Sequence, residues 1–258
     1  MPLRICILQA DDLHPDLASQ YHSFGQMFER LLSQQALPVR CEVFDVVAQQ
    51  YPDDSSYYDA FLVTGSKADS FAMDAWIVRL REYLQQRYQQ GDVLLGVCFG
   101  HQILALALGG LTERASQGWG VGVHCYKVLG APVAGLEVPR QLQLLISHRD
   151  QVTRLPEQAV RIASSEFCPN AAYVVGEQVL CFQGHPEFTH DFSRALLNLR
   201  RSIYTPEFYA QGLASLEQQH DGGVVAGWMT EFIAQARRNR ERQLVSKGNQ
   251  EPEACANP

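Results

Sequence analysis

The sequence predicts an α/β fold: an open, mixed but mainly parallel sheet with helices on both faces. Short apolar runs alternate with helical segments as far as Gly110, which is typical of a parallel, doubly wound sheet. The run at Leu3–Leu8 is apolar apart from Arg4, as in a strand that is covered on both faces. Another of these runs ends at Gly96-Val97-Cys98-Phe99-Gly100 and passes directly into a helix.

The first half of the chain contains the elements of this doubly wound sheet. We expect strands at Leu3–Leu8, Val39–Val46, 59–64 and 93–97. Apolar residues at helical spacing predict helices at Tyr21–Gln35, at Asp74–Gln90 with Asp74 as N-cap, and at 103–108. A loop is expected from Asp11 to Pro15, and a turn at Gly65-Ser66-Lys67.

The second half changes character, because short strand-like runs separated by turns replace the alternation. They occupy Leu111–Ala115, Val121–Leu129, Gln143–Ser147, Val160–Ala163, Ala172–Val175 and Gln178–Phe182. Helices return from His190, with one beginning at Pro206 and a last one at Val224–Arg237. We therefore predict one domain over residues 1–237. The polar stretch 238–258 lacks periodicity and is expected to be a disordered tail.

Composition narrows the class of protein. Of the 258 residues, 46% are hydrophobic and 19% charged, as in soluble globular proteins. The net charge of −7 argues against a nucleic acid or an anionic membrane as partner, since either favours a basic surface. No apolar run is long enough for a membrane span. The first residues are expected to form a strand rather than a signal peptide.

The cysteines predict a reducing environment. There are seven, and none lies in a C-x-x-C pair, so the sequence suggests neither a disulfide framework nor a zinc knuckle. Cys6, Cys41, Cys125 and Cys181 fall in strand-like runs and are expected to be unreactive core thiols. A cytoplasmic location is the corresponding expectation.

Cys98 is the candidate nucleophile. Strand, sharp turn at Gly-x-Cys-x-Gly and helix form the cysteine counterpart of a nucleophile elbow. Such a turn presents the side chain at the carboxyl end of the sheet, where open α/β folds have their sites. The helix N-terminus favours thiolate over thiol. The alternative is a buried structural cysteine, but the flanking glycines favour the nucleophile.

A cysteine nucleophile needs a base, and the base needs an orienting partner. His185 and Glu187 follow a predicted strand, and Pro186 restricts His185 to an extended conformation. Side chains two residues apart on an extended segment point the same way, so Glu187 is expected beside the imidazole. His148 is a competing base, and a metal site of His185, Glu187 and His190 is a further alternative.

Acyl transfer also needs donors for the oxyanion. One candidate is the N–H of Phe99, directly after the cysteine. The second is the turn Thr64-Gly65-Ser66, where glycine lets the backbone approach a ligand. Adjacent parallel strands bring these two positions to the same edge of the sheet.

Together, Gly96-Val97-Cys98-Phe99-Gly100-His101-Gln102 and Gln183-Gly184-His185-Pro186-Glu187 resemble the signature of class I glutamine amidotransferases. The resemblance covers most of the chain, including Val63-Thr64-Gly65-Ser66 and His148-Arg149-Asp150-Gln151-Val152. It implies a flavodoxin-like fold and hydrolysis of a γ-glutamyl amide through a thioester on Cys98. It further implies His185 as base, Glu187 as its orienter, Gly65 and Phe99 as oxyanion donors, and Gln102 as a residue lining the glutamyl site.

Within the family, the sequence resembles the stand-alone branch close to the glutaminase domain of GMP synthase, which includes γ-glutamyl peptidases. We expect Gly184, before the base, to leave room for an amine larger than ammonia. The predicted function is a self-sufficient hydrolase of a small γ-glutamyl substrate, without cofactor or metal. The alternative is a glutaminase subunit that supplies ammonia to a separate synthetase partner. The 11–20 loop and Trp119 are candidate contacts of the substrate, with a Trp119 packed on the core as the alternative. Arg149 and Asp150 either hold the α-carboxylate and α-amino groups of the substrate or pair only with each other.

Overall fold

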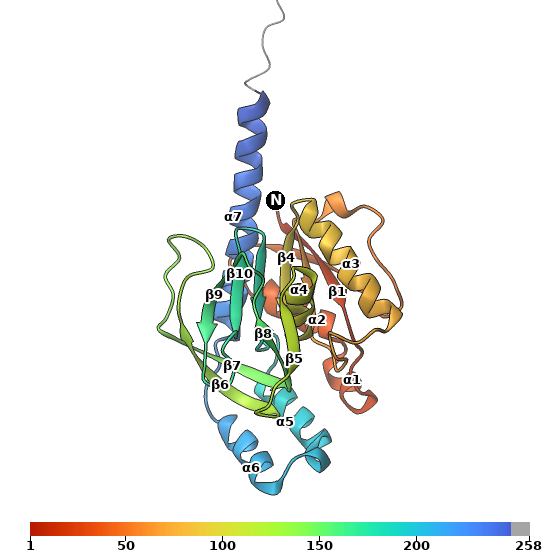
Figure 1. Ribbon diagram of the computed structural model, residues 1–258, viewed down its shortest axis with the longest axis vertical. Helices are drawn as coiled ribbons and strands as arrows, with labels where there is room; N and C mark the ends of the chain where they lie inside the picture. Colours follow the sequence, from red (N-terminus) through yellow and green to blue (C-terminus); the bar gives the residue numbers. More distant parts are fainter. Residues whose placement is uncertain (249–258) are drawn as a thin grey trace, which may run out of the picture.

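A nine-stranded sheet forms the centre of the protein, in the strand order β2-β1-β3-β4-β11-β10-β9-β6-β7 (Figure 1). The computed structural model describes residues 1–248. The strands are β1 (Leu3–Gln9), β2 (Val39–Asp45), β3 (Ala60–Val63), β4 (Val93–Val97), β5 (Leu111–Arg114), β6 (Gly120–Val128), β7 (Gln141–His148), β8 (Asp150–Arg154), β9 (Ala159–Ser164), β10 (Ala172–Val175) and β11 (Val179–Phe182).

The sheet has a parallel and an antiparallel part. β2, β1, β3, β4 and β11 pair in parallel, whereas β10, β9, β6 and β7 continue the sheet in antiparallel pairs. β5 and β8 form a separate two-stranded sheet. The strand order 2-1-3-4 is that of flavodoxin-like folds, which confirms the predicted fold class.

Helices cover both faces of the parallel part. They are α1 (Pro15–Tyr21), α2 (Phe24–Ser33), α3 (Ala75–Gln89), α4 (Phe99–Ala107), α5 (His190–Leu199), α6 (Pro206–Ser215) and α7 (Gly222–Gly248), with short 3₁₀ turns η1 (Ser55–Tyr57) and η2 (Arg201–Ile203). Alternate residues of β1 enter opposite cores. Ile5 and Ile7 pack in the core that contains α2 and α7, whereas Cys6 and Leu8 pack with α3 and α4.

A third apolar cluster lies at the carboxyl end of the parallel strands. α1, α5 and α6 gather at this end of the molecule, opposite the free end of α7 (Figure 1). The cluster joins Leu13 and Leu17 to Phe188 and Phe192 from the other half of the chain, with Leu145 of β7 beneath them. It thereby forms a wall beside the strand ends.

Two elements differ from the predictions, and one predicted N-cap lacks its side-chain hydrogen bond. The stretch after β1 is not all loop, since α1 begins at Pro15 with the His14 side chain as its N-cap. β8 follows β7 after a single residue and was not predicted, because its sequence is mostly polar. Asp74 is the N-cap residue of α3, although its side chain makes no capping hydrogen bond.

The prediction of a disordered tail from residue 238 is wrong as far as Gly248, since α7 continues to that residue. Ion pairs replace apolar periodicity here: Arg237 pairs with Glu241 at 3.3 Å, and Arg238 with Glu231 at 2.5 Å. Arg240 also donates a hydrogen bond to the carbonyl of Asp59 at 2.9 Å. The rest of the predicted tail, 249–258, lies outside the described residues.

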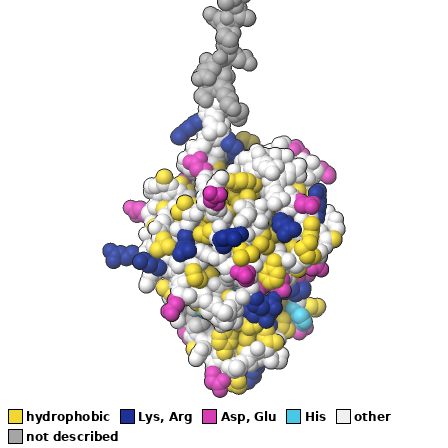
Figure 2. Space-filling model, in the orientation of Figure 1, with side chains coloured by type: hydrophobic (Ala, Val, Ile, Leu, Met, Phe, Trp, Pro, Cys, Tyr) yellow, Lys and Arg dark blue, Asp and Glu magenta, His cyan; other side chains and the backbone are white. Residues whose placement is uncertain are grey.

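Surface charge, helix hydrophobicity and cysteine burial can each be compared with the predictions. Acidic and basic side chains are interspersed on the face that Figure 2 shows, rather than gathered in one basic field. Within residues 1–248, no helix is both long and apolar enough to cross a membrane. Cys6 and Cys181 are buried as predicted, but Cys125 is exposed, because its position on β6 faces outward.

Candidate active site

Cys98 occupies a strained turn between β4 and α4. It is the N-cap residue of α4 and has φ 54° and ψ −103°, a backbone conformation that side chains rarely adopt. The residues two positions before and two positions after Cys98 must be glycine. A Cβ on Gly96 would lie 2.6 Å from the carbonyl carbon of Gly100, and a Cβ on Gly100 would lie 2.3 Å from the carbonyl oxygen of Val63. The two glycines therefore permit the close packing that makes this turn.

His185 and Glu187 form a buried pair just after β11. The His185 Nδ1 and a Glu187 carboxylate oxygen are 2.7 Å apart, and both side chains are almost inaccessible to solvent. The backbone N–H of His185 donates to the carbonyl of Leu145 on β7 at 2.8 Å. The Phe188 ring stacks on the imidazole with centroids 3.8 Å apart. These contacts fix the orientation of the ring, with Nδ1 engaged by the carboxylate.

The surroundings of His185 favour the charged, doubly protonated imidazolium at neutral pH. Burial by itself lowers the pKa of His185, but the charges of Glu187 and Cys98, together with hydrogen bonds to both, outweigh it and raise the pKa to about 10. Cys98 therefore lies close enough to the imidazole for its charge to act on His185. The site thus favours an imidazolium beside the Glu187 carboxylate.

The turn after β3 brings Gly65 to the same place. A Cβ on Gly65 would lie 2.8 Å from Cε1 of His185 and 3.7 Å from Cβ of Cys98. Within the described residues, the N–H groups of Gly65 and Phe99 have no hydrogen-bond acceptor. The two predicted oxyanion donors are therefore brought beside Cys98 with their N–H groups unused.

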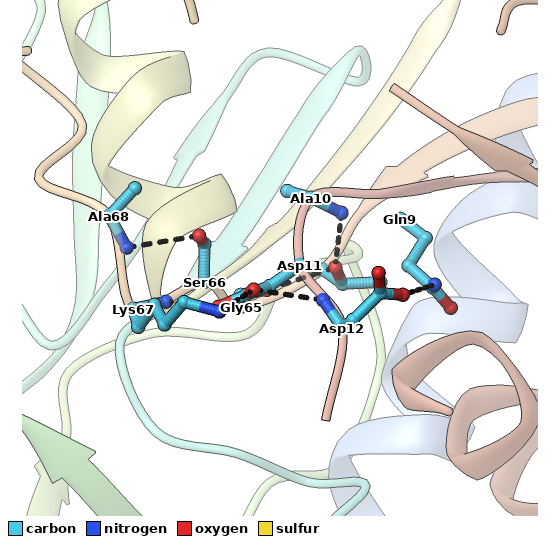
Figure 3. A network of polar contacts seen from close by, with 9 residues as sticks. Gln9, Ala10, Asp11, Asp12, Gly65, Ser66, Lys67 and Ala68 are labelled. Carbon is cyan, nitrogen blue, oxygen red and sulfur yellow. Dashed lines mark hydrogen bonds and ion pairs between the residues drawn. The ribbon is translucent and has the colours of Figure 1, made fainter. Parts of the chain in front are cut away.

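A polar network holds this turn against the end of β1 (Figure 3). The Thr64 hydroxyl accepts a hydrogen bond from the N–H of Ala10 and donates one to the carbonyl of Gly65, both at 3.0 Å. The Asp11 carboxylate accepts from the backbone N–H and from the Nζ of Lys67, both at 2.7 Å. The network fixes the backbone that carries Gly65.

Two cavities meet at Cys98. The first, which we call the polar cavity, has a volume of about 230 Å³ and includes Gln102, Trp119, Arg149 and Asp150 in its lining. Gln102 lies here as predicted, with its amide donating to the carbonyl of Asp150 at 2.8 Å. Asp150 pairs with Arg114 at 3.1 Å rather than with the neighbouring Arg149.

Trp119 contacts two guanidinium groups at the polar cavity. Arg149 is 5.4 Å from the ring centroid, and Arg200 is 5.6 Å from it. Arg200 also donates to the hydroxyl of Ser147 at 3.0 Å. No local sequence pattern marks Arg200, because it reaches the site only through the packing of α5.

The second cavity, the aromatic cavity, has a volume of about 460 Å³. Cys98 and His185 lie at one end, and Phe24, Phe188 and Phe192 are among its apolar walls. Part of the predicted 11–20 loop also lines it. The prediction that Gly184 leaves room beside the site is wrong, because a Cβ there would meet the Leu144 side chain at 2.7 Å, in the core.

The alternative roles for other histidines find less support. His148 is held by the Asp150 carbonyl at 3.2 Å. Burial, with the neighbouring charge of His185, lowers its pKa to about 3, so His148 stays neutral. His190 instead contacts the carbonyl of Gln218 at 2.7 Å. In the part of the chain that the structure describes, no group of three or more His, Cys, Asp or Glu residues is arranged for a metal ion.

Fold and site together define a flavodoxin-like α/β protein with a cysteine on a strand-to-helix turn, beside a buried histidine–glutamate pair. The family model described as glutamine amidotransferase class-I matches residues 20–198. The chain belongs to the class I glutamine amidotransferase family, as its motifs predict.

Relatives agree with this family, and a solved structure agrees with the fold. Gamma-glutamyl peptidase 3 of Arabidopsis thaliana is 32% identical, over 68% of this chain and 75% of that protein. The glutamine-hydrolyzing GMP synthase of Christiangramia forsetii is 30% identical, over 65% of this chain but 32% of that protein. A glutamine amidotransferase structure from Thermotoga maritima has a TM-score of 0.70 at 16% identity, covering 90% of this chain and 99% of that chain, which supports the fold.

Proposed function

We propose that the protein hydrolyses a γ-glutamyl amide, with Cys98 as nucleophile, His185 as acid and base, and Glu187 as the group that orients His185. The family and its γ-glutamyl peptidase relatives support a role as γ-glutamyl amide hydrolase or glutamine amidotransferase. The observation that carries the proposal is the meeting of two cavities at Cys98, with His185 lining the aromatic cavity.

The reaction proceeds in two halves. The Cys98 thiolate attacks the γ-carbonyl carbon, and the N–H groups of Gly65 and Phe99 stabilise the oxyanion. When the intermediate collapses, the C–N bond breaks and His185 gives its proton to the departing amine, leaving a γ-glutamyl thioester. Water then attacks the thioester and transfers a proton to His185. The C–S bond breaks, which releases glutamate and regenerates the thiolate.

The amide is oriented by the different chemistry of the two cavities. The polar cavity, with Gln102 and Arg149, suits the α-amino and α-carboxylate groups of the glutamyl part. The departing amine takes its proton from His185 and therefore leaves through the aromatic cavity. A cavity with three phenylalanine walls is larger and more apolar than ammonia requires. This favours a self-sufficient γ-glutamyl peptidase over a subunit that transfers ammonia.

The second candidate is a glutaminase subunit that delivers ammonia to a synthetase partner. The similarity to part of a GMP synthase supports it. Turnover by the purified chain alone separates the two candidates. Ready hydrolysis of γ-glutamyl dipeptides, faster than that of glutamine, is the expected result, and activity on glutamine that requires an added synthetase would favour the subunit.

The nucleophile is tested with the same substrates. Mixing γ-glutamyl amides with the protein should give a mass increase of one glutamyl group on a peptide that contains Cys98. The Cys98→Ala variant should lose activity by about 10⁴-fold or more, because no thiolate remains to attack. Cys168→Ala, at another buried cysteine, is the matched control. Near-normal hydrolysis by Cys98→Ala would exclude the proposed mechanism.

A further inference from the structure

We propose that Arg200 binds the α-carboxylate of an amino-acid leaving group, which selects γ-glutamyl derivatives of apolar α-amino acids over glutamine. The inference rests on the proposed hydrolysis and specifies its substrate. Arg200 lies where the two cavities meet, since it lines both of them together with Cys98.

The position of the leaving group follows from the proton donor. His185 is part of the aromatic cavity lining and is not part of the polar cavity lining. In a γ-glutamyl amino acid, the scissile nitrogen carries a carbon that bears both a carboxylate and a side chain. The carboxylate must therefore lie close to Cys98, while the side chain extends further into the aromatic cavity.

Arg200 is the cation available at that position. Lys67 also lines both cavities, but its Nζ is already paired with Asp11 at 2.7 Å. The Arg200 guanidinium donates to a neutral hydroxyl, that of Ser147, and within residues 1–248 it forms no ion pair with a carboxylate. It is half-buried, so a carboxylate that enters the cavity meets a partly desolvated, uncompensated charge.

Arg149 supplies a second guanidinium, so the site has one cation for each carboxylate of a γ-glutamyl amino acid. Arg149 lines the polar cavity and is not part of the aromatic cavity lining. Both guanidinium groups contact the Trp119 ring, 5.4 Å (Arg149) and 5.6 Å (Arg200) from its centroid. A γ-glutamyl amino acid has one carboxylate on each side of the scissile amide, whereas glutamine has only one. Apolar contact with Phe24 and Phe192 favours aromatic or aliphatic side chains on the leaving group.

The test compares γ-glutamylphenylalanine with its α-carboxamide, which lacks only the leaving-group carboxylate. The wild-type protein should prefer the acid in kcat/KM by about 10- to 100-fold, the range for a hydrogen-bonded ion contact. Arg200→Met should abolish this preference, and Arg200→Lys should retain part of it. Arg201→Met is the matched control, because Arg201 is exposed and lies over Tyr209, and it should keep the preference.

Equal kcat/KM for acid and carboxamide in the wild-type protein would overturn the role of Arg200 while leaving the hydrolase intact. So would an unchanged preference in Arg200→Met. If no γ-glutamyl compound is hydrolysed, calorimetry with the Cys98→Ala protein decides separately. Tighter binding of the acid that disappears in Cys98→Ala/Arg200→Met would support the Arg200 contact and reject only the hydrolysis. Equal binding of both compounds would reject the contact too.

Discussion

The polar and aromatic cavities meet at the same cysteine but are built from different parts of the chain. The polar cavity is lined by the turns after β3 and β7, by the start of β8 and by Gln102 of α4, with Trp119 just before β6 and Arg200 just after α5. The aromatic cavity is formed by the loop after β1 and by α1, α2 and α5, which pack over the sheet edge. The polar cavity thus draws mainly on loops at the strand ends, whereas the apolar walls of the aromatic cavity come from helices and the segments beside them.

This difference separates two kinds of specificity. Side chains of the polar cavity are tied to the sheet by backbone contacts, such as that of Gln102 with the Asp150 carbonyl. They suit the γ-glutamyl group that all substrates of the family share. Side chains of the aromatic cavity come from surface helices, which can change without disturbing the sheet. We infer that the polar cavity determines the acyl group and the aromatic cavity determines the amine.

The largest effect is expected at the His185–Glu187 pair, because the proposed reaction at Cys98 depends on it whichever amine leaves. Glu187→Gln should lower kcat by about 10²- to 10⁴-fold with little change in KM, because the imidazole loses its orienting charge. The loss should be equal for glutamine and for γ-glutamyl dipeptides. A loss confined to one substrate class would show that Glu187 acts on binding instead.

Glu187→Gln should also change the pH dependence of kcat. Against the opposing effect of burial, the charges of Glu187 and Cys98 raise the pKa of His185 to about 10, so the imidazolium is lost only as the pH rises through that value. The raised pKa likewise gives a contribution to stability that is full below the unfolded pKa and lost as the pH approaches about 10. Glu187→Gln should move the alkaline limb of kcat towards neutral pH. An unmoved limb would contradict the assignment.

A smaller, uniform effect is expected from the polar cavity. Arg149→Met should reduce kcat/KM by about 10- to 100-fold for glutamine and γ-glutamyl dipeptides alike, because both present the same α-carboxylate. Steady-state kinetics with the two substrates measures this. Arg154→Met, at the far end of β8, is the control. A reduction for dipeptides alone would mean that Arg149 contacts the leaving group and would break the division between the cavities.

The part of the site that the sequence predicts is the part encoded locally. Gly96-x-Cys98-x-Gly100 and the spacing of His185 and Glu187 are short patterns, and the strand order brings their ends to one edge. The structure also places Gly65 beside them. The fold was predictable for the same reason, because strand and helix periods are local. Polar segments such as β8 and the end of α7 were missed, because pairing and ion pairs stabilise them rather than apolar periodicity.

The aromatic cavity was not predictable, because it depends on contacts between distant segments. Phe24 of α2 lies 6.4 Å from both Phe188 and Phe192, ring centroid to ring centroid, across more than half the chain. Each phenylalanine taken alone is typical of a core residue. The Gly184 prediction failed similarly: its motif is local, but the space beside it is filled by Leu144 from β7.

The smallest effect is expected at Phe24, and it tests the aromatic cavity alone. Phe24 is half-buried at the start of α2, so Phe24→Ala removes part of the cavity wall without emptying a core. The ratio of kcat/KM for γ-glutamylphenylalanine to that for glutamine should fall by about 10-fold, since lost apolar contact of this size costs about 1–3 kcal/mol. Phe208→Ala, on α6 outside the lining of either cavity, should keep the ratio. An unchanged ratio in Phe24→Ala would mean that the leaving group does not enter the aromatic cavity, and the site would then fit an ammonia-releasing glutaminase better than a peptidase.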